Sequence, residues 1–486
     1  MADTGIAPHG SVAPPLTNRR YRQSREPIIA LQPGDRQPSR HGSFVDMTAR
    51  IERDAVLRRH IGAFALSAAV VNGVVGAGIF TLPAAMAAAA GARAPLAYLV
   101  CAVAMSFVVV CFAEAGSRLP TSGGVYGTVT FAFGPLTGFV CGMLTWMASV
   151  LACGGITGAL ADTIGTVLPA LSAGFGRAAV ILVSIGAIAV VNLRGVREAA
   201  WMVSAATLIK LVPLVLFVTV GAGLLIAGVV PPLGLDTAPA SGLGKAVILG
   251  VFAFSGMETP LAASGEVADG HRNVPRALFG AMGFVLVLYV GIQLVAQFLL
   301  GAGLAHQTAP LAAAATRIGP VARMVLVVGA GLSMFAWIGS DILGAPRILF
   351  AFARDGLLPQ ALGRAHPRTH APDIAIIAHA AIAAGLALSG SFTGLVVAST
   401  LNTAGLYFLG CGAAWVLHRR RTQMLGVPVN FALLPAAAVC GMVAMVLLVC
   451  VAPADEILGL VAVVVGSVAL YLAMRRLGDR GRTAHS

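Results

Sequence analysis

Apolar stretches of about 20 residues recur along the chain, and they restrict its fold more than any other feature. A helix of that length crosses the hydrocarbon core of a bilayer, where an open strand would leave backbone groups unpaired. Only 10% of the residues are charged and 58% are hydrophobic, whereas soluble domains usually carry about 25% charged residues. We therefore expect an all-α integral membrane protein rather than a soluble one.

Pro, Gly and charged residues divide the apolar sequence into twelve candidate transmembrane helices. They span 62–91, 95–117, 135–168, 178–194, 201–228, 245–267, 275–300, 320–353, 373–390, 393–417, 429–451 and 456–474. Residues 1–60 precede them, contain ten arginines and lack the apolar stretch of a signal peptide. We expect this segment to be a disordered cytoplasmic tail.

The net charge of +13 is distributed as in a membrane protein rather than a nucleic-acid-binding one. If the helices cross the membrane in turn, 26 of the 32 Lys and Arg residues lie on the side of the amino terminus and five on the other, and Lys210 lies within a span. Cationic residues favour the cytoplasmic side. Both termini are therefore expected to be cytoplasmic, in an inner or plasma membrane, with no nucleic acid partner.

Glycine interrupts two of the candidate helices where lipid would penalise it, because freed backbone groups in hydrocarbon need partners. The first helix contains Gly73–Phe80 and the sixth contains Phe252–Glu258. Close helix packing is an alternative use for such glycines. Two breaks five helices apart instead favour an inverted-repeat transporter with a substrate site near the middle of the membrane.

Five short motifs occur in the order typical of the amino acid/polyamine/organocation permease superfamily, which the chain resembles over most of residues 62–420. They are Gly76–Phe80, Ala113–Arg118 followed by Pro120 and Ser122–Tyr126, Asn192–Val196, Asn273–Arg276 and Ala353–Pro359. The resemblance implies a leucine-transporter fold, with ten helices in two inverted halves of five and two peripheral helices. It also implies a transport core over 61–421, peripheral helices within 422–476 and a cytoplasmic tail over 477–486.

A broken helix can bind both ends of a zwitterionic amino acid with peptide groups alone. The amides of Gly76, Ala77 and Gly78 would bind the carboxylate at the positive end of a helix. The carbonyl of Val74 and those of the sixth-helix break would bind the ammonium group. The candidate site in the sixth helix comprises Phe252, Ala253, Phe254, Ser255 and Gly256.

Two of these positions carry further expectations from the resemblance. Similar permeases have an aromatic residue at the position of Phe252, where it covers the substrate; a lipid-facing or core Phe is the alternative. Many members have serine where this chain has Ala77. The chain therefore lacks a hydroxyl that would bind the carboxylate.

Lys210 is the one cation near the middle of a span, and an ionisable residue there suggests function. It resembles the fifth-helix lysine of sodium-independent permeases, which occupies the space that a sodium ion fills in sodium-coupled relatives. We expect its ammonium group to hold helices one and eight together when charged and to release them when neutral. A lysine that extends to the membrane interface and anchors its helix is the alternative.

Other polar residues in the spans have several candidate roles. Asp341 would pair with Lys210, contact a cationic substrate, carry a proton or form a structural hydrogen bond. Glu258 is expected in a proton path, and Glu114 as a structural partner of Arg118 or another arginine at a helix end. His379 is expected to be a packing residue whose hydrogen bonds are satisfied.

These features favour a secondary transporter that couples uptake of a small neutral amino acid to protons, because the third helix has no acidic residue near its middle to bind a cationic side chain. Exchange of cationic amino acids or polyamines, with Asp341 as counter-charge, remains an alternative. A membrane sensor or assembly subunit that does not transport is another.

An enzymatic or metal-dependent role is not expected from the sequence. It has no Walker A loop and no intramembrane His/Glu/Asp cluster at metal or triad spacing. We therefore expect no catalytic residue, metal or cofactor. The expected partners are the amino acid substrate, protons and membrane lipid; the oligomeric state is left open.

Overall fold

The structure is a computed structural model that describes residues 62–119, 124–194, 196–234, 242–258, 267–366, 369, 371–422 and 428–483. For residues 77, 196–209, 270, 271 and 478–483 it describes the backbone alone. The expected disordered tail over residues 1–60 lies outside these ranges, as do Pro120, Ser122 and Gly123 of the second motif.

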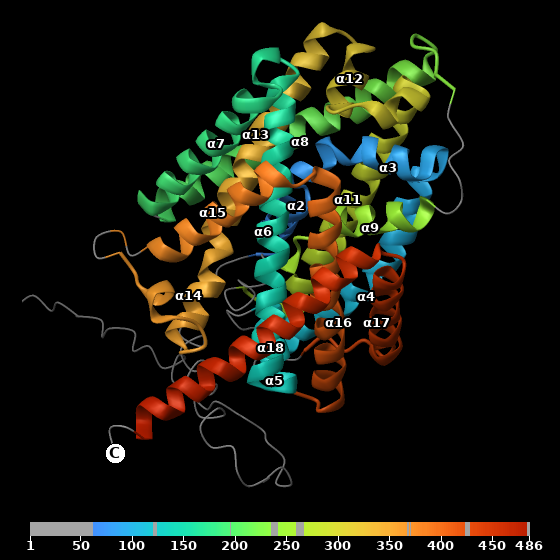
Figure 1. Cartoon of the computed structure of the whole chain (residues 1–486). Coiled ribbons are helices and arrows are strands. Elements are labelled where there is room, and N and C mark those ends of the chain that lie inside the picture. The colour runs from blue at the N-terminus through green and yellow to red at the C-terminus, as the bar shows by residue number, and fades with distance from the viewer. Residues whose placement is uncertain are drawn as a thin grey trace, which may run out of the picture. The chain divides into compact units, whose positions relative to one another are not determined.

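The described residues form helices and no extended strand (Figure 1). The α-helices are α2 (Ala63–Val74), α3 (Leu82–Ala90), α4 (Ala94–Arg118), α5 (Gly124–Phe133), α6 (Pro135–Gly165), α7 (Gly174–Arg194), α8 (Val196–Ile226), α9 (Leu243–Phe254), α11 (Gly270–Leu300), α12 (Pro310–Thr316), α13 (Pro320–Gly344), α14 (Pro346–Arg354), α15 (Asp373–Ser389), α16 (Phe392–Arg419), α17 (Leu434–Cys450) and α18 (Ala454–Thr483). Each of the twelve predicted segments overlaps one or more of them.

Seven of the described helical segments are long and apolar enough to cross a membrane, and six shorter apolar helices accompany them. The seven are Leu82–Arg118, Pro135–Gly165, Gly174–Arg194, Arg272–His306, Pro320–Arg354, Phe392–Arg419 and Ala454–Leu477. Because a soluble protein would not carry so many such segments, the chain is an all-α, multi-pass membrane protein.

Helix α6 is central to the packing. It runs through the middle of the helices in Figure 1 and packs against α16, α15, α13 and α5. Most of its residues are buried, and several are glycines that let neighbouring helices approach closely. The mostly buried α6 therefore brings side chains from α13, α15 and α16 close to one another.

Both predicted helix breaks are present. Helix α2 ends at Val74, and a short 3₁₀ turn, η1 (Ala77–Phe80), precedes α3. Helix α9 ends at Phe254; Ser255 is extended and Gly256 has a φ of 107°. The predicted sixth helix extended to residue 267, but residues 259–266 lie outside the described ranges.

The structure differs from the predicted helices in two respects. The segment predicted as one helix over 320–353 divides into α13 and α14 just before Pro346, whose ring cannot continue a helix's hydrogen bonds. Short helices α5 and α12 were not predicted, because at 10 and seven residues they are too short to span a membrane.

Candidate functional site

The two helix breaks adjoin each other, although their residues are far apart in the sequence. A Cβ atom built on Gly256 would lie 2.5 Å from the carbonyl oxygen of Gly73. A Cβ atom on Gly78 would lie 2.8 Å from Cε1 of Phe252. The structure therefore brings Gly78 and Phe252, two of the predicted site residues, into contact.

Two carbonyl groups at the end of α2 accept hydrogen bonds from side chains of other helices. The last four carbonyls of a helix lack partners within it. The carbonyl of Asn72 accepts a hydrogen bond of 2.7 Å from Nζ of Lys210, and that of Val74 accepts one of 2.9 Å from the hydroxyl of Tyr289. The amide of Gly76 also donates to Val74, at 2.7 Å. The carbonyl predicted to bind the substrate ammonium is thus already hydrogen-bonded.

Lys210 itself shows what this end of α2 binds. Its side chain is 3% exposed, and its ammonium group lies against a peptide carbonyl at the negative end of a helix dipole. Among the described residues no carboxylate forms an ion pair with it. The lysine therefore joins α8 to the first helix, and α8 also packs against α13.

In the break of the sixth helix, the chain supplies most of its own partners. The amide of Gly256 donates to Oε2 of Glu258 at 3.0 Å, and the hydroxyl of Tyr407 in α16 donates to the same oxygen at 2.8 Å. The carbonyl of Phe252 accepts from the amide and the hydroxyl of Ser255, at 3.2 and 2.8 Å. Glu258 thus fastens the break to α16.

Aromatic side chains cover the breaks, and sequence reasoning identified only some of them. The indole of Trp337 in α13 lies over Gly76, where a Cβ atom would be 2.9 Å from the ring. Phe254 packs against Tyr98 and Tyr289, with ring centroids 6.4 and 5.7 Å apart. Nothing in the local sequence distinguishes Trp337 from other aromatic residues in the spans. The side chains of Phe252 and Trp337 fill space beside the first break.

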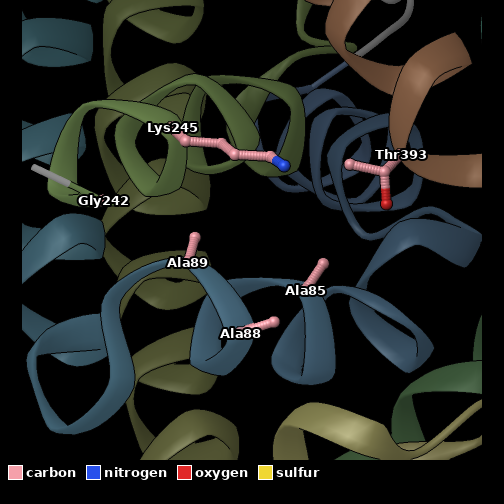
Figure 2. Close-up of a pocket in the computed structure, with 6 residues that line it drawn as sticks. All are labelled: Ala85, Ala88, Ala89, Gly242, Lys245 and Thr393. Atoms are coloured by element: carbon pink, nitrogen blue, oxygen red, sulfur yellow. The ribbon is translucent and has the colours of Figure 1, made fainter. Parts of the chain in front are cut away.

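A cavity of about 290 Å³ lies at the far end of α3 from the break (Figure 2). It is lined by Ala85, Ala88, Ala89, Gly242, Lys245 and Thr393. The side chain of Lys245 extends across it in Figure 2. Its volume is near the lower limit of about 300 Å³ for ligand pockets. No predicted site residue lines this cavity.

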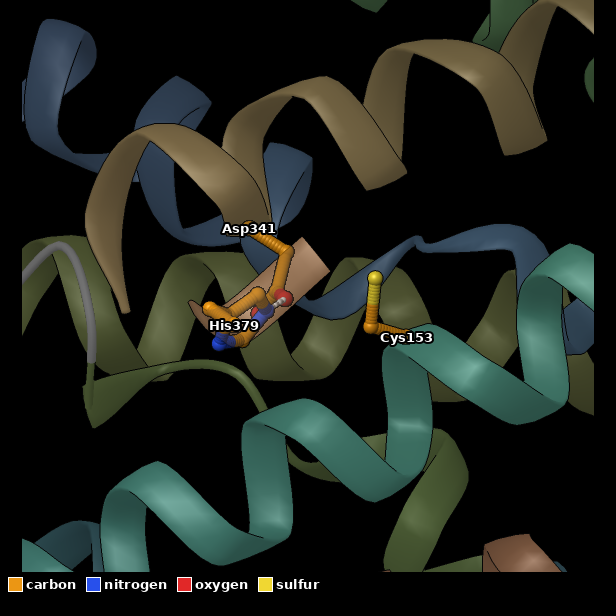
Figure 3. A group of neighbouring side chains, drawn as sticks. All are labelled: Cys153, Asp341 and His379. Carbon is orange, nitrogen blue, oxygen red and sulfur yellow. Dashed lines mark hydrogen bonds and ion pairs between the residues drawn. The ribbon is translucent and has the colours of Figure 1, made fainter. Parts of the chain in front are cut away.

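Asp341 lies in a polar cluster that the sequence did not predict. Its Oδ2 is 2.9 Å from Nε2 of His379 in α15, and the hydroxyl of Ser149 in α6 donates to its Oδ1. Sγ of Cys153, a carboxylate oxygen of Asp341 and a ring nitrogen of His379 all lie within 4.8 Å of one another (Figure 3). The bonds to Asp341 come from Ser149 and His379, not from Lys210.

One expectation is therefore corrected. No intramembrane cluster was expected from the sequence, but the fold brings Cys153, Asp341 and His379 together. His379 is buried, as expected, and pairs with Asp341. The residues come from three helices, so their sequence spacing could not reveal them. Such residue types also bind transition metals, but metal-bound histidines usually donate their second N–H. Nδ1 of His379 has no hydrogen-bond partner among the described residues.

Glu114 confirms its predicted pairing. It is 0% exposed and lies 2.7 Å from Arg118, four residues later in α4. It also bonds Nδ1 of His418 at 2.7 Å and accepts from the amide of Phe431 at 2.9 Å. The predicted structural role is confirmed by these contacts.

Comparisons with known proteins agree with this fold. The family model described as amino acid permease matches residues 61–472. An uncharacterised transporter of Mycobacterium tuberculosis (strain ATCC 25618 / H37Rv) is 30% identical over 74% of this chain and 81% of its own.

Two Bacillus subtilis (strain 168) proteins are also similar. The serine/threonine exchanger SteT is 25% identical over 80% of this chain and 90% of its own, and the branched-chain amino acid permease BcaP is 28% identical over 69% and 76%. With its interrupted helices and a family match over most of its length, the chain belongs to the amino acid permease family of the amino acid/polyamine/organocation superfamily.

Proposed function

We propose that this permease takes up a small neutral amino acid together with protons, by alternating access. The observation that carries the proposal is the meeting of two interrupted helices, where the backbone of one break lies against the backbone of the other inside a membrane protein. Such unwound backbone is tolerated at membrane depth where it lines a cavity or is buried in protein.

The substrate carboxylate would bind at the start of η1, where the amides of Ala77 and Gly78 have no partner within the turn. Its ammonium group would bind the carbonyls of the sixth-helix break, which lies against the end of α2. The ring of Phe252 lies on Gly78 and must move for a substrate to enter. This contact supports a gating role for Phe252.

Lys210, Glu258 and Asp341 are the proposed coupling groups. Lys210 in its charged form holds α8 to the first helix, and a neutral amine would hold it less strongly, because hydrogen bonds to charged groups are roughly twice as strong as neutral ones. Glu258 links the sixth-helix break to Tyr407 of α16. Loss of a proton from Lys210, or gain of a proton by Glu258, would therefore loosen a contact at a break.

The wider architecture follows from the same proposal. It has twelve membrane spans, a core over 61–421 built from two inverted halves of five helices, and two peripheral helices within 422–476. Both termini, including the tails over 1–60 and 477–486, are cytoplasmic, and the membrane is the cell membrane. The two breaks, in the first and the sixth predicted span, support this division.

Exchange is the alternative transport mode, and the similarity to a serine/threonine exchanger favours keeping it. Exchange of cationic amino acids or polyamines requires a counter-charge. Asp341, the predicted candidate, is bonded to Ser149 and His379. We therefore rank a neutral substrate first. A membrane sensor or assembly subunit would bind an amino acid without moving it.

Purified protein in liposomes tests the function directly. A thermal-shift screen against the common amino acids and polyamines first selects a ligand. We then expect the labelled ligand to accumulate inside the liposomes when the outside is acidic, and to exchange with unlabelled ligand without a gradient. Exchange without accumulation would support an exchanger instead. A ligand that binds but neither accumulates nor exchanges would contradict transport.

A further inference from the structure

His379 is held in one orientation by a carboxylate and presents its other ring nitrogen to no partner. The side chain is 0% exposed, and Nε2 lies 2.9 Å from Oδ2 of Asp341. When Asp341 is ionised it only accepts, which places the hydrogen on Nε2 of His379 and leaves Nδ1 as an acceptor. Nδ1 is buried and has no hydrogen-bond partner among the described residues. The ring therefore offers an unused basic nitrogen inside the protein.

We propose that the Asp341–His379 pair is a proton-binding site of the transport cycle, in which Nδ1 of His379 takes the proton and Asp341 provides the counter-charge. This inference rests on the proposed function and adds His379, which sequence reasoning treated as packing. The step forms one N–H bond on the imidazole and breaks none in the protein. The proton comes from the acidic side and leaves with the substrate on the other.

Charge balance favours this assignment. With Asp341 ionised and His379 neutral, the pair carries one negative charge inside a membrane protein, which is costly. One bound proton makes it a neutral ion pair. The same division of roles operates in Ser-His-Asp triads, where a carboxylate orients the imidazole and stabilises its protonated form.

The groups around the pair do not supply this charge. Cys153 of α6 is the titratable group beside it, and Ser149 of the same helix donates to Asp341. Arg177 of α7 pairs with Asp162 at 2.7 Å. Among the described ion pairs, none joins Asp341 or His379 to Lys210 of α8 or to an arginine of α14. A proton is therefore the cation that fits the pair.

Helix α13 connects the pair to the substrate site. Trp337 lies one turn before Asp341 on this helix, and its indole covers Gly76 at the first break. Ser149, on the other side of the carboxylate, is partly exposed. Loss of the proton leaves a charge that attracts water between α6 and α13. Entry of water would move α13 relative to α6 and so shift Trp337 on Gly76.

The test separates coupling from transport. If one proton moves with each substrate, a gradient of one pH unit drives about tenfold accumulation, because a pH unit is worth about 1.4 kcal/mol. We expect His379→Gln and Asp341→Asn in liposomes to lose this accumulation, with an inside-to-outside ratio near one. Both should keep exchange without a gradient. The matched control is His418→Gln, which removes another histidine bonded to a carboxylate and should keep accumulation.

The outcomes distinguish this inference from the proposed function. Accumulation by His379→Gln equal to that of the wild type would overturn the inference and leave the transporter intact. Wild-type protein that neither accumulates nor exchanges any ligand would refute the function itself. If either variant fails to fold, nitrogen NMR of histidine-labelled wild-type protein still decides. Nδ1 must change protonation across the pH range in which uptake changes, and a nitrogen that stays unprotonated there overturns the inference.

Discussion

The two helix breaks solve the same problem with different partners. The carbonyls at the end of α2 are satisfied by side chains of other helices, Lys210 and Tyr289. In the sixth-helix break, the amide of Gly256 is satisfied by Glu258, only two residues away. At the first break, a carbonyl acceptor therefore bonds a cationic side chain. At the second break, an amide donor bonds an anionic one. Partners that belong to other helices separate from α2 when those helices move. A partner two residues away moves together with the break.

Gly256→Ala should produce the largest effect, because it breaks the contact between the two breaks. A side chain at a φ of 107° is strained, and its Cβ would meet the backbone of Gly73. We expect a loss of at least about 2 kcal/mol in stability, measured by thermal unfolding in detergent. Gly280→Ala is the matched control, since no atom lies within 4 Å of its Cβ position. Equal unfolding temperatures for the two variants would refute the close contact.

Lys210→Met should weaken the first break without touching the second. It leaves the carbonyl of Asn72 without its donor, which costs about 1–3 kcal/mol for a buried acceptor. Substrate binding, measured by scintillation proximity at several pH values, should lose much of its pH dependence. The conservative Lys210→Arg tests whether charge alone suffices. A methionine variant with unchanged pH dependence would remove Lys210 from coupling.

Gly78→Ala tests the contact between the first break and Phe252 of the sixth predicted helix. Its Cβ would lie 2.8 Å from the ring of Phe252, which must turn aside. Because a side chain can move where a backbone cannot, we expect the fold to survive and substrate affinity to fall about tenfold, or about 1.4 kcal/mol. Isothermal titration measures it. Restored affinity in Gly78→Ala combined with Phe252→Leu would confirm the contact, and no change in the single variant would contradict it.

Glu258→Gln should have the smallest effect on stability, within about 1 kcal/mol. The amide oxygen of Gln can still accept from Gly256 and Tyr407. Exchange should continue, while accumulation driven by a pH gradient should fall if the carboxylate takes part in coupling. Unchanged accumulation would mean that Glu258 only stabilises the second break through its hydrogen bonds.

The sequence predicted those features that depend on neighbours along the chain. Glycine clusters within apolar segments revealed both breaks, and the position of Glu114 near the end of its helix suggested a partner among the nearby arginines, which is Arg118. Features that depend on packing were not predictable. Trp337 reaches Gly76, and Asp341 reaches His379, across helices whose relative rotation no local pattern records. The substrate site therefore stays a prediction, and Trp337, which covers the first break, was not foreseen.

The bonds that Glu114 and Arg118 form with residues before α17 limit where the chain can be shortened. Arg118 donates to Asn430 at 3.0 Å, and Glu114 accepts from the amide of Phe431, so the connection leading into α17 is fastened to α4. Removing everything after α16 would leave two opposite charges facing solvent or lipid with half their bonds gone. Fluorescent fusions and affinity handles therefore belong beyond α18, and the last two helices should be retained in any shortened version made for crystallisation or cryo-microscopy.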